Sequence, residues 1–301
     1  MTNQAAMNDG VALTAVGAAA ARAVESSREA ALITDPYAAA LVAAADAPVP
    51  FPVVWPAADA ELTEQQTMLL MGANYVGIRS KYFDDFLLEA VDNGIRQIVI
   101  LASGLDTRGY RLPVPAELQL FEIDQPQVLD FKARTLDSLN AQSNGKVIPV
   151  GIDLREDWPA ALRAAGFDAA QPTGWLIEGL LVYLSGPEES ELLNRVNGLS
   201  ASHSLVALEG AASLPEPSAE DLERLREASK QSGLPMAEIL KIMGGRQPLE
   251  DTLHGLGWTA QSSTAEQVAL SYNRHLIDPR FAPAGQSPSA PGATLLSAQK
   301  N

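Results

Sequence analysis

Acidic residues follow several short apolar segments of this 301-residue sequence, and they are the side chains best suited to hold a polar ligand. The residues that end these segments or follow them are Ser103, Gly104, Asp124, Asp153, Leu154 and Glu178. A carboxylate buried without a partner is costly, so acids at three successive segment ends are hard to explain by packing alone. The pattern predicts one polar binding site that is assembled from several parts of the chain.

Gly104 and Asp124 have the spacing of a nucleoside-binding pair. A glycine after a strand lets the backbone approach a ligand closely. Asp124 stands 20 positions beyond Gly104, about the spacing at which an acid meets a ribose in dinucleotide-binding folds. Because a carboxylate can accept hydrogen bonds from both ribose hydroxyls, the pair indicates a nucleoside ligand.

Phosphate-binding motifs are missing from the sequence, which contains neither G-x-G-x-x-G nor G-x-x-x-x-G-K-[ST]. Pyrophosphate ligands favour Gly-rich turns, backbone N–H groups and often a lysine, whereas this predicted site is acidic. S-adenosyl-L-methionine contains adenosine without phosphate and carries a positively charged sulfonium and ammonium. An acidic rim suits that cofactor.

Structural roles are the alternative for most of these residues. Gly104 could serve only as a turn, Asp124 beside Pro126 could cap a helix, and Asp153 could cap the helix that follows it. Glu178 lies in an apolar segment, so a structural role explains it least well.

Strand-like and helix-like segments alternate through the middle of the chain and would position these residues. Strands are expected at 97–102, 118–123, 146–150, 175–178 and 204–209, and helices at 126–140, 156–165 and 187–201. Such alternation predicts a parallel sheet covered on both faces, with ligands beyond the carboxyl ends of its strands. Two last strands, at 258–262 and 293–298, would be joined by a Pro-rich loop at 279–291.

Two helical regions flank this alternation. The Ala-rich segment 12–45 predicts a helix interrupted near Asp35-Pro36, and a second helix is expected over 61–93. We therefore expect residues 1–93 to form a helical cap and residues 94–301 to form the binding core. A charged segment at about 214–247 predicts a helical insertion in that core.

Composition limits the partners and the compartment. The formal net charge of −16 disfavours nucleic acid and anionic membranes, and no segment has the length of apolar sequence that crosses a bilayer. There are no cysteines, and the histidines at 203, 254 and 275 have no metal-ligand spacing. We expect a cytoplasmic protein with no metal site that acts on a small molecule.

At these same segments the sequence resembles the leucine carboxyl methyltransferase family, in particular its bacterial branch of S-adenosylmethionine-dependent methyltransferases, which is abundant in actinobacteria. The resemblance covers about residues 12–210. The blocks that carry it are TDPYA at 34–38, RSKYFDDF at 79–86, ILASGLDTRGYRL at 100–112, FEIDQP at 121–126 and EGLLVYL at 178–184.

The resemblance implies a class I methyltransferase fold, which is a Rossmann-like, seven-stranded, mostly parallel α/β sheet with a helical N-terminal cap and an inserted lid. It also implies roles in binding the cofactor. Arg79 would hold its methionine carboxylate, Gly104 would belong to the first strand loop, and Asp124 would bind the ribose. Asp153 and Leu154 would hold the adenine, and Glu178 would lie near the amino group.

Two other functions compete with a methyltransferase. An NAD-dependent oxidoreductase is disfavoured by the missing dinucleotide fingerprint and the missing Tyr-x-x-x-Lys pair. A non-enzymatic module that binds the cofactor or a nucleoside is left open. For an enzyme, the family favours O-methylation of a small carboxylate or hydroxyl, and a carboxylate is the simpler acceptor because it is already ionised at pH 7.

Overall fold

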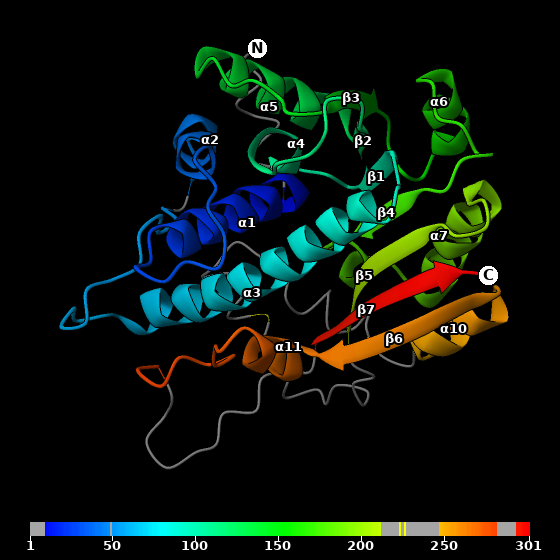
Figure 1. Ribbon diagram of the computed structural model, residues 1–301. Helices are drawn as coiled ribbons and strands as arrows, with labels where there is room; N and C mark the ends of the chain where they lie inside the picture. Colours follow the sequence, from blue (N-terminus) through cyan, green and yellow to red (C-terminus); the bar gives the residue numbers. More distant parts are fainter. Residues whose placement is uncertain (1–9, 49, 212–222, 224–225, 227–246, 282–292) are drawn as a thin grey trace.

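The apolar segments of the sequence form the strands of one seven-stranded sheet in the computed structural model, which describes residues 10–48, 50–211, 223, 226, 247–281 and 293–301 (Figure 1). The strands are β1 (Gln97–Leu101), β2 (Gln119–Asp124), β3 (Lys146–Gly151), β4 (Gly174–Ile177), β5 (Leu205–Ala211), β6 (Trp258–Thr264) and β7 (Ala293–Lys300). Their order is β3-β2-β1-β4-β5-β7-β6; β7 runs antiparallel to both β5 and β6, and the other neighbouring pairs are parallel. The predicted sheet, with its five parallel strands and two last strands, is confirmed.

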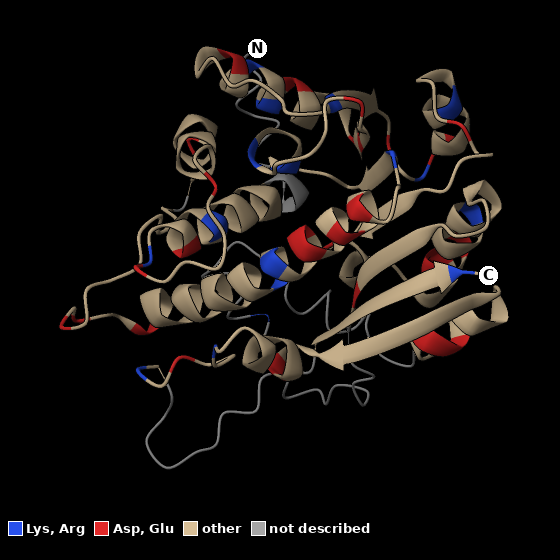
Figure 2. Cartoon of the chain, in the orientation of Figure 1, with Lys and Arg blue, Asp and Glu red and all other residues tan. Residues whose placement is uncertain are grey.

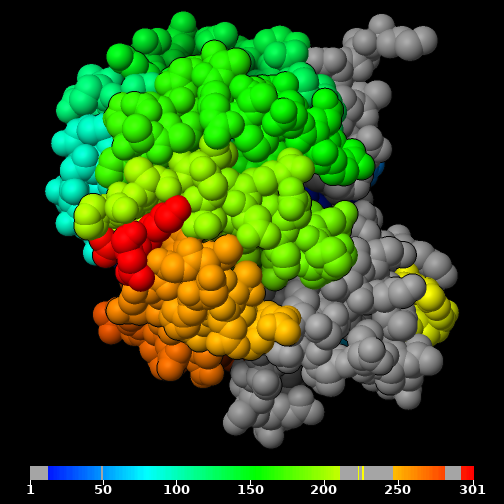
Figure 3. Space-filling view, turned by 90° about the vertical axis from the view of Figure 1, so that its right-hand side faces the viewer, coloured from blue at the N-terminus to red at the C-terminus, as the bar shows by residue number. Residues whose placement is uncertain are grey.

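β7 reaches its place between β5 and β6 from the end of the chain. Its residues pair with both neighbours, so that Leu296 lies opposite Leu208 of β5 and Ser262 of β6. In the side view, the last residues (red) lie between the yellow-green segment around β5 and the orange segment around α10 and β6 (Figure 3). β7 is therefore an inner strand of the sheet, and β6 forms its edge.

Helices cover both faces of the sheet. They are α1 (Gly10–Ser26), α2 (Ala38–Ala45), α3 (Glu64–Asp92), α4 (Arg108–Arg111), α5 (Pro126–Ser138), α6 (Trp158–Ala164), α7 (Gly186–Leu199), α10 (Leu249–Gly255) and α11 (Ala265–Ser271), with a short 3₁₀ turn, η2 (Leu181–Tyr183). Residues of α3 and α11 pack on one face, against Ile98 and Leu176. Residues of α6, α7 and α10 pack on the other, against Val99 and Trp175, as strand alternation requires.

Local sequence signals set several helix starts. Thr63 and Gln66 form a capping box at the start of α3, and Ser185 and Glu188 form one at α7, where Pro187 occupies the first turn. Such caps satisfy N–H groups that the first helical turn leaves free.

The single interrupted helix expected over 12–45 is wrong in detail. α1 ends at Ser26, where the hydroxyls of Ser26 and Ser27 donate to the carbonyls of Arg22 and Val24. The Asp35 carboxylate then accepts from the backbone N–H of Ala38 at 3.1 Å and starts α2. Serine and aspartate side chains compete with helical hydrogen bonds in this way, so the gap is 11 residues wide rather than a local kink.

The region between β6 and β7 contains a helix that the sequence does not predict. α11 was not expected between β6 and β7, and a capping box of Thr264 and Gln267 begins it. Most of the predicted insertion at 214–247 and of the Pro-rich loop at 279–291 lies outside the described residues. The division at residue 93 stays a prediction, and α3, which precedes it, shares an apolar core with β1, β2, β4 and β5.

Candidate cofactor-binding site

The loops that follow β1, β2, β4 and β5 lie at one edge of the sheet, because these strands are parallel and paired in register. Leu101 lies opposite Ile123, and Ile177 lies opposite Leu208. The structure therefore brings Gly104, Asp124 and Glu178 to one edge, as the sequence predicts.

The loop after β1 is shaped around Gly104. Ala102 and Gly104 both have a φ of 51°, in the left-handed region that favours glycine. A Cβ added to Gly104 would lie 3.1 Å from the Cβ of Ala15 in α1, so helix α1 packs directly over this glycine. The hydroxyl oxygen of Ser103 is buried and has no hydrogen-bond partner among the described residues.

Asp124 is tied to this loop. Its Oδ2 accepts from the backbone N–H of Gly104 at 2.6 Å, and its Oδ1 accepts from that of Gln125 at 2.7 Å. Burial raises the pKa of Asp124, although both N–H groups favour its charged form. Helix α5 has Gln125 as its N-cap, so Asp124 is not the cap of that helix. Each carboxylate oxygen keeps acceptor capacity for a further donor.

Asp153 and Leu154 follow β3, whose Gly151 lies opposite Asp124. Both Asp153 oxygens bind the guanidinium of Arg155, at 2.9 and 2.6 Å, and the hydrogen bonds from Arg155 lower the pKa of Asp153 to about 2. Asp157, and not Asp153, caps α6. Leu154 packs at the margin of the apolar core on the α6 face. Asp153 and Leu154 therefore lie at the same carboxyl edge of the sheet as Asp124, and the Asp153 carboxylate is bound by Arg155.

Arg79 of α3 reaches the end of β4 and binds Glu178. Its Nε donates to Glu178 Oε1 at 2.8 Å, and Arg108 Nη2 lies 2.9 Å from the other oxygen. Burial alone would raise the pKa of Glu178, but the charges of Arg108 and Arg79 lower it. Glu178 is therefore an ionised, paired carboxylate, which explains how an acid is tolerated beside an apolar strand.

Glu209, near the end of β5, is part of the same cluster and was not among the predicted site residues. It accepts from Arg79 Nη1 at 2.9 Å and from the backbone N–H of Gly179 at 2.8 Å, and the Tyr75 hydroxyl also donates to it. The rule that found Asp124 and Glu178, an acid at the end of an apolar segment, also finds Glu209.

A second set of ion pairs is joined to Glu178 through Arg108. Arg108 is only 3% exposed, and its guanidinium binds Asp84 at 2.7 Å and also Asp106. Arg111 donates to Asp84 as well, at 2.7 Å from its Nη2. All four lie in the sequence blocks at 79–86 and 100–112, but their pairing depends on contacts between α3 and the β1 loop that spacing alone does not give.

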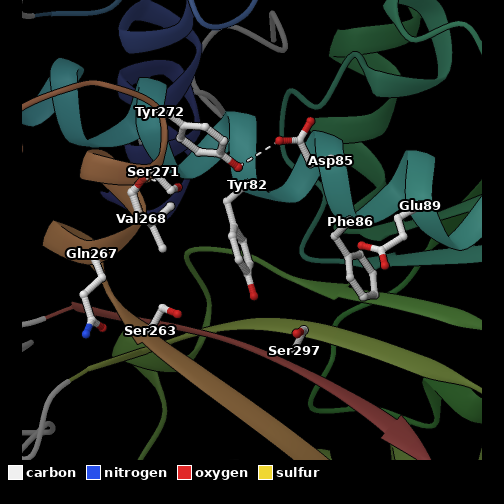
Figure 4. Close-up of a pocket in the computed structure, with 10 residues that line it drawn as sticks. All are labelled: Tyr82, Asp85, Phe86, Glu89, Ser263, Gln267, Val268, Ser271, Tyr272 and Ser297. Carbon is white, nitrogen blue, oxygen red and sulfur yellow. Dashed lines mark hydrogen bonds between the residues drawn. The ribbon is translucent and has the colours of Figure 1, made fainter.

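A groove of about 320 Å³ lies elsewhere, between α3, α11 and the strands β6 and β7 (Figure 4). The Tyr272 hydroxyl donates to Asp85 at its rim, at 2.8 Å. The residues that line this groove include none of the predicted site residues. Among the described residues, no group of three histidines or acids is placed to hold a metal ion, and no helix has the length and apolar character to cross a bilayer.

The residues at the carboxyl edge fit S-adenosylmethionine by their chemistry. The site offers a buried Ser103 hydroxyl that has no partner in the described part of the chain, a close-approach glycine at Gly104, and carboxylates at Asp124 and Glu178. Carboxylates accept from hydroxyl and ammonium groups, and a guanidinium such as that of Arg79 binds a carboxylate. No phosphate cradle is needed for such a ligand.

The strand order and the polar edge define a class I methyltransferase. A crystal structure of a DUF574 family protein from Streptomyces avermitilis has a similar fold, with a TM-score of 0.50 and 14% identity over 81% of this chain and 92% of that one. The pattern of the leucine carboxyl methyltransferase family matches residues 15–197. The chain belongs to this family.

Relatives support the same membership. A protein from Mycobacteroides abscessus is 42% identical over 276 residues, which cover 89% of this chain and 88% of the relative. One from Mycolicibacterium smegmatis is 44% identical over 255 residues, covering 82% and 83%. Both carry names that describe S-adenosyl-L-methionine-dependent methyltransferases.

Proposed function

We propose that this protein transfers the methyl group of S-adenosylmethionine to an oxygen atom of a small molecule, and that the preferred acceptor is a carboxylate. Methyl transfer from this cofactor follows from the family and from the names of the relatives. The observation that carries the cofactor assignment is the set of buried acids and Arg79 at the carboxyl edge, without a phosphate-binding loop.

In this proposal Asp124 accepts from the ribose hydroxyls, while Ser103 and Gly104 border the cofactor along the β1 loop. Arg79 binds the methionine carboxylate, and Glu178 lies near the ammonium. Asp153 and Leu154 lie beside the adenine. When bound, the cofactor supplies an electrophilic methyl group, and the protein's own contribution is to hold acceptor and methyl group in line.

A carboxylate acceptor is supported by the positions of the histidines. His203 precedes β5 and His254 lies in α10 before β6, so both stand at the amino edge of the sheet, away from the site. His275 is exposed. Glu209 is already engaged by three donors. A hydroxyl acceptor needs a general base, and an ionised carboxylate does not.

The remaining parts of the proposal concern organisation and setting. Residues 1–93 form a cap over a core of residues 94–301. The enzyme works in the cytoplasm and does not bind nucleic acid, in line with its net charge of −16 and its lack of cysteines.

A panel of small hydrophobic carboxylic acids and phenols, assayed with labelled cofactor, tests the acceptor class. We expect methyl esters as products and a rate that is flat between about pH 6 and 8, since no group near neutrality must lose a proton. Changing each histidine to Gln should keep turnover within about tenfold. A hundredfold loss in one variant that still binds cofactor would replace the carboxylate with a hydroxyl acceptor and a histidine base.

A further inference from the structure

Glu209 joins three separate elements at the site. It is 5% exposed, and its donors come from α3 (Tyr75 and Arg79) and from the turn after β4 (Gly179). Gly179 has a φ of +66°, and a Cβ there would lie 3.6 Å from both terminal nitrogens of Arg79. The carboxylate of Glu209 thus fixes both the guanidinium and the backbone turn against which that guanidinium lies.

Arg79 is held on two sides in this arrangement. Its Nε binds Glu178 and its Nη1 binds Glu209, so the orientation of the planar guanidinium is set before any ligand arrives. A preorganised fork loses less freedom when it binds a carboxylate than a mobile one does. Glu209 would therefore act on the methionine end of the cofactor through Arg79.

The cluster also has an uneven charge. Its guanidiniums belong to Arg79, Arg108 and Arg111, and its carboxylates belong to Asp84, Asp106, Glu178 and Glu209. Three positive charges against four negative charges leave a formal charge of −1. The neighbouring pairs Arg22–Asp35 and Lys132–Glu122 are each formally neutral and leave this sum unchanged, and Asp124 at the same edge adds to the negative side. S-adenosylmethionine has a net charge of +1, whereas S-adenosylhomocysteine, which has lost the sulfonium charge, is neutral. Burial strengthens such interactions.

We propose that Glu209 is a positioning residue that orients Arg79 for the methionine carboxylate, and that its buried charge makes the site prefer the cationic cofactor over its neutral product. This inference rests on the proposed function. It explains how the same site would bind the cofactor firmly and release the product after the methyl group has left.

Calorimetry on Glu209→Gln with three ligands tests this role. The ligands are S-adenosylmethionine, S-adenosylhomocysteine, and 5′-methylthioadenosine, which lacks the amino-acid part. We expect affinity to fall by at least about tenfold for the first, by about threefold for the second and by less than about twofold for the third. The matched control is Glu191→Gln, an exposed acid paired with Arg195, which should leave all three affinities within about twofold.

The pattern of losses separates the possible outcomes. Equal losses for all three ligands would mean a merely structural role, and no loss for the first two would also overturn the proposal. If Glu209→Gln does not fold, Tyr75→Phe removes one donor to Glu209 and keeps its charge. This variant should bind S-adenosylmethionine and S-adenosylhomocysteine about threefold more weakly than wild type and should bind 5′-methylthioadenosine as wild type does. Equal losses of affinity for all three ligands would contradict the proposal. A wild-type protein that binds none of them would instead refute the proposed function.

Discussion

Two charged clusters meet on helix α3, where Arg79 belongs to one cluster and Lys81, two positions further on, belongs to the other. Arg79 points to the carboxyl edge, where its side chain is 12% exposed and that of Glu209 is 6% exposed. Lys81 pairs instead with Asp85 beside the groove, where the two side chains are 31% and 41% exposed. Figure 2 shows basic and acidic residues close together along this helix.

The difference between the two clusters lies in burial and partners rather than in residue types. Lys81 and Asp85 form an i,i+4 pair with Tyr272 nearby, and water screens such a pair. Arg79 binds Glu178, which follows β4, and Glu209 in β5; these acids are 31 positions apart in sequence, and all three side chains are largely shielded from water. A change in the buried cluster should therefore alter binding or stability, and the same kind of change in the exposed cluster should not.

The largest effect is expected for Asp124→Ala. If Asp124 accepts from both ribose hydroxyls, its removal deletes two charge-assisted hydrogen bonds, of order 3 kcal/mol, or about a hundredfold in S-adenosylmethionine affinity. Asp124→Asn should show part of that loss. Titration calorimetry on folded variants measures both. Normal affinity in a folded Ala variant would limit Asp124 to holding the Gly104 loop.

Asp106 should control stability at acidic pH. Burial alone would raise its pKa, but the charges of Arg108, Arg22 and Lys132 lower it to about 2. Because the folded pKa is depressed, the stabilisation is complete above the ordinary value near 4 and is lost as the pH falls through 2. It amounts to about 2 kcal/mol.

Urea unfolding of wild type and Asp106→Asn at pH 5 and near pH 2 tests this coupling. The wild type should lose about 2 kcal/mol more than the variant over that range. Equal pH dependence in the two proteins would show that Asp106 does not titrate within the buried cluster.

Arg79→Lys is expected to have a smaller and more selective effect. A lysine keeps one positive charge but cannot bind a carboxylate through two parallel bonds. We expect about a tenfold loss of affinity for S-adenosylmethionine, with adenosine binding nearly unchanged. Equal losses for both ligands would favour a role of Arg79 in folding.

The exposed cluster provides the smallest expected effect. Asp85→Asn removes the negative charge that pairs with Lys81, and it leaves one amide oxygen in place of the two carboxylate oxygens that bind Lys81 and the Tyr272 hydroxyl. Cofactor affinity should stay within about twofold and the free energy of unfolding within about 1 kcal/mol. A tenfold loss of affinity would show that the two sides of α3 are coupled.

The sheet could be predicted from sequence because each buried strand is a short apolar run next to a turn, as at 97–102. Asp124 and Glu178 could be found because they end such runs. Arg79 was predicted only through the family resemblance. Its pairing with Glu178, and the pairing of Arg108 with Asp84, could not be predicted from spacing, because these residues meet only after α3 has packed on the sheet. The short helix α11 was missed because its capping box and few apolar residues give a weak signal over one segment of seven residues.

Calorimetry with unmodified protein tests the central claim most directly. S-adenosylmethionine or S-adenosylhomocysteine should bind at about one ligand per chain, since the acidic strand ends suit a cofactor without phosphate. NAD should show no binding under the same conditions. Tighter binding of NAD than of either ligand would contradict the assignment of the site.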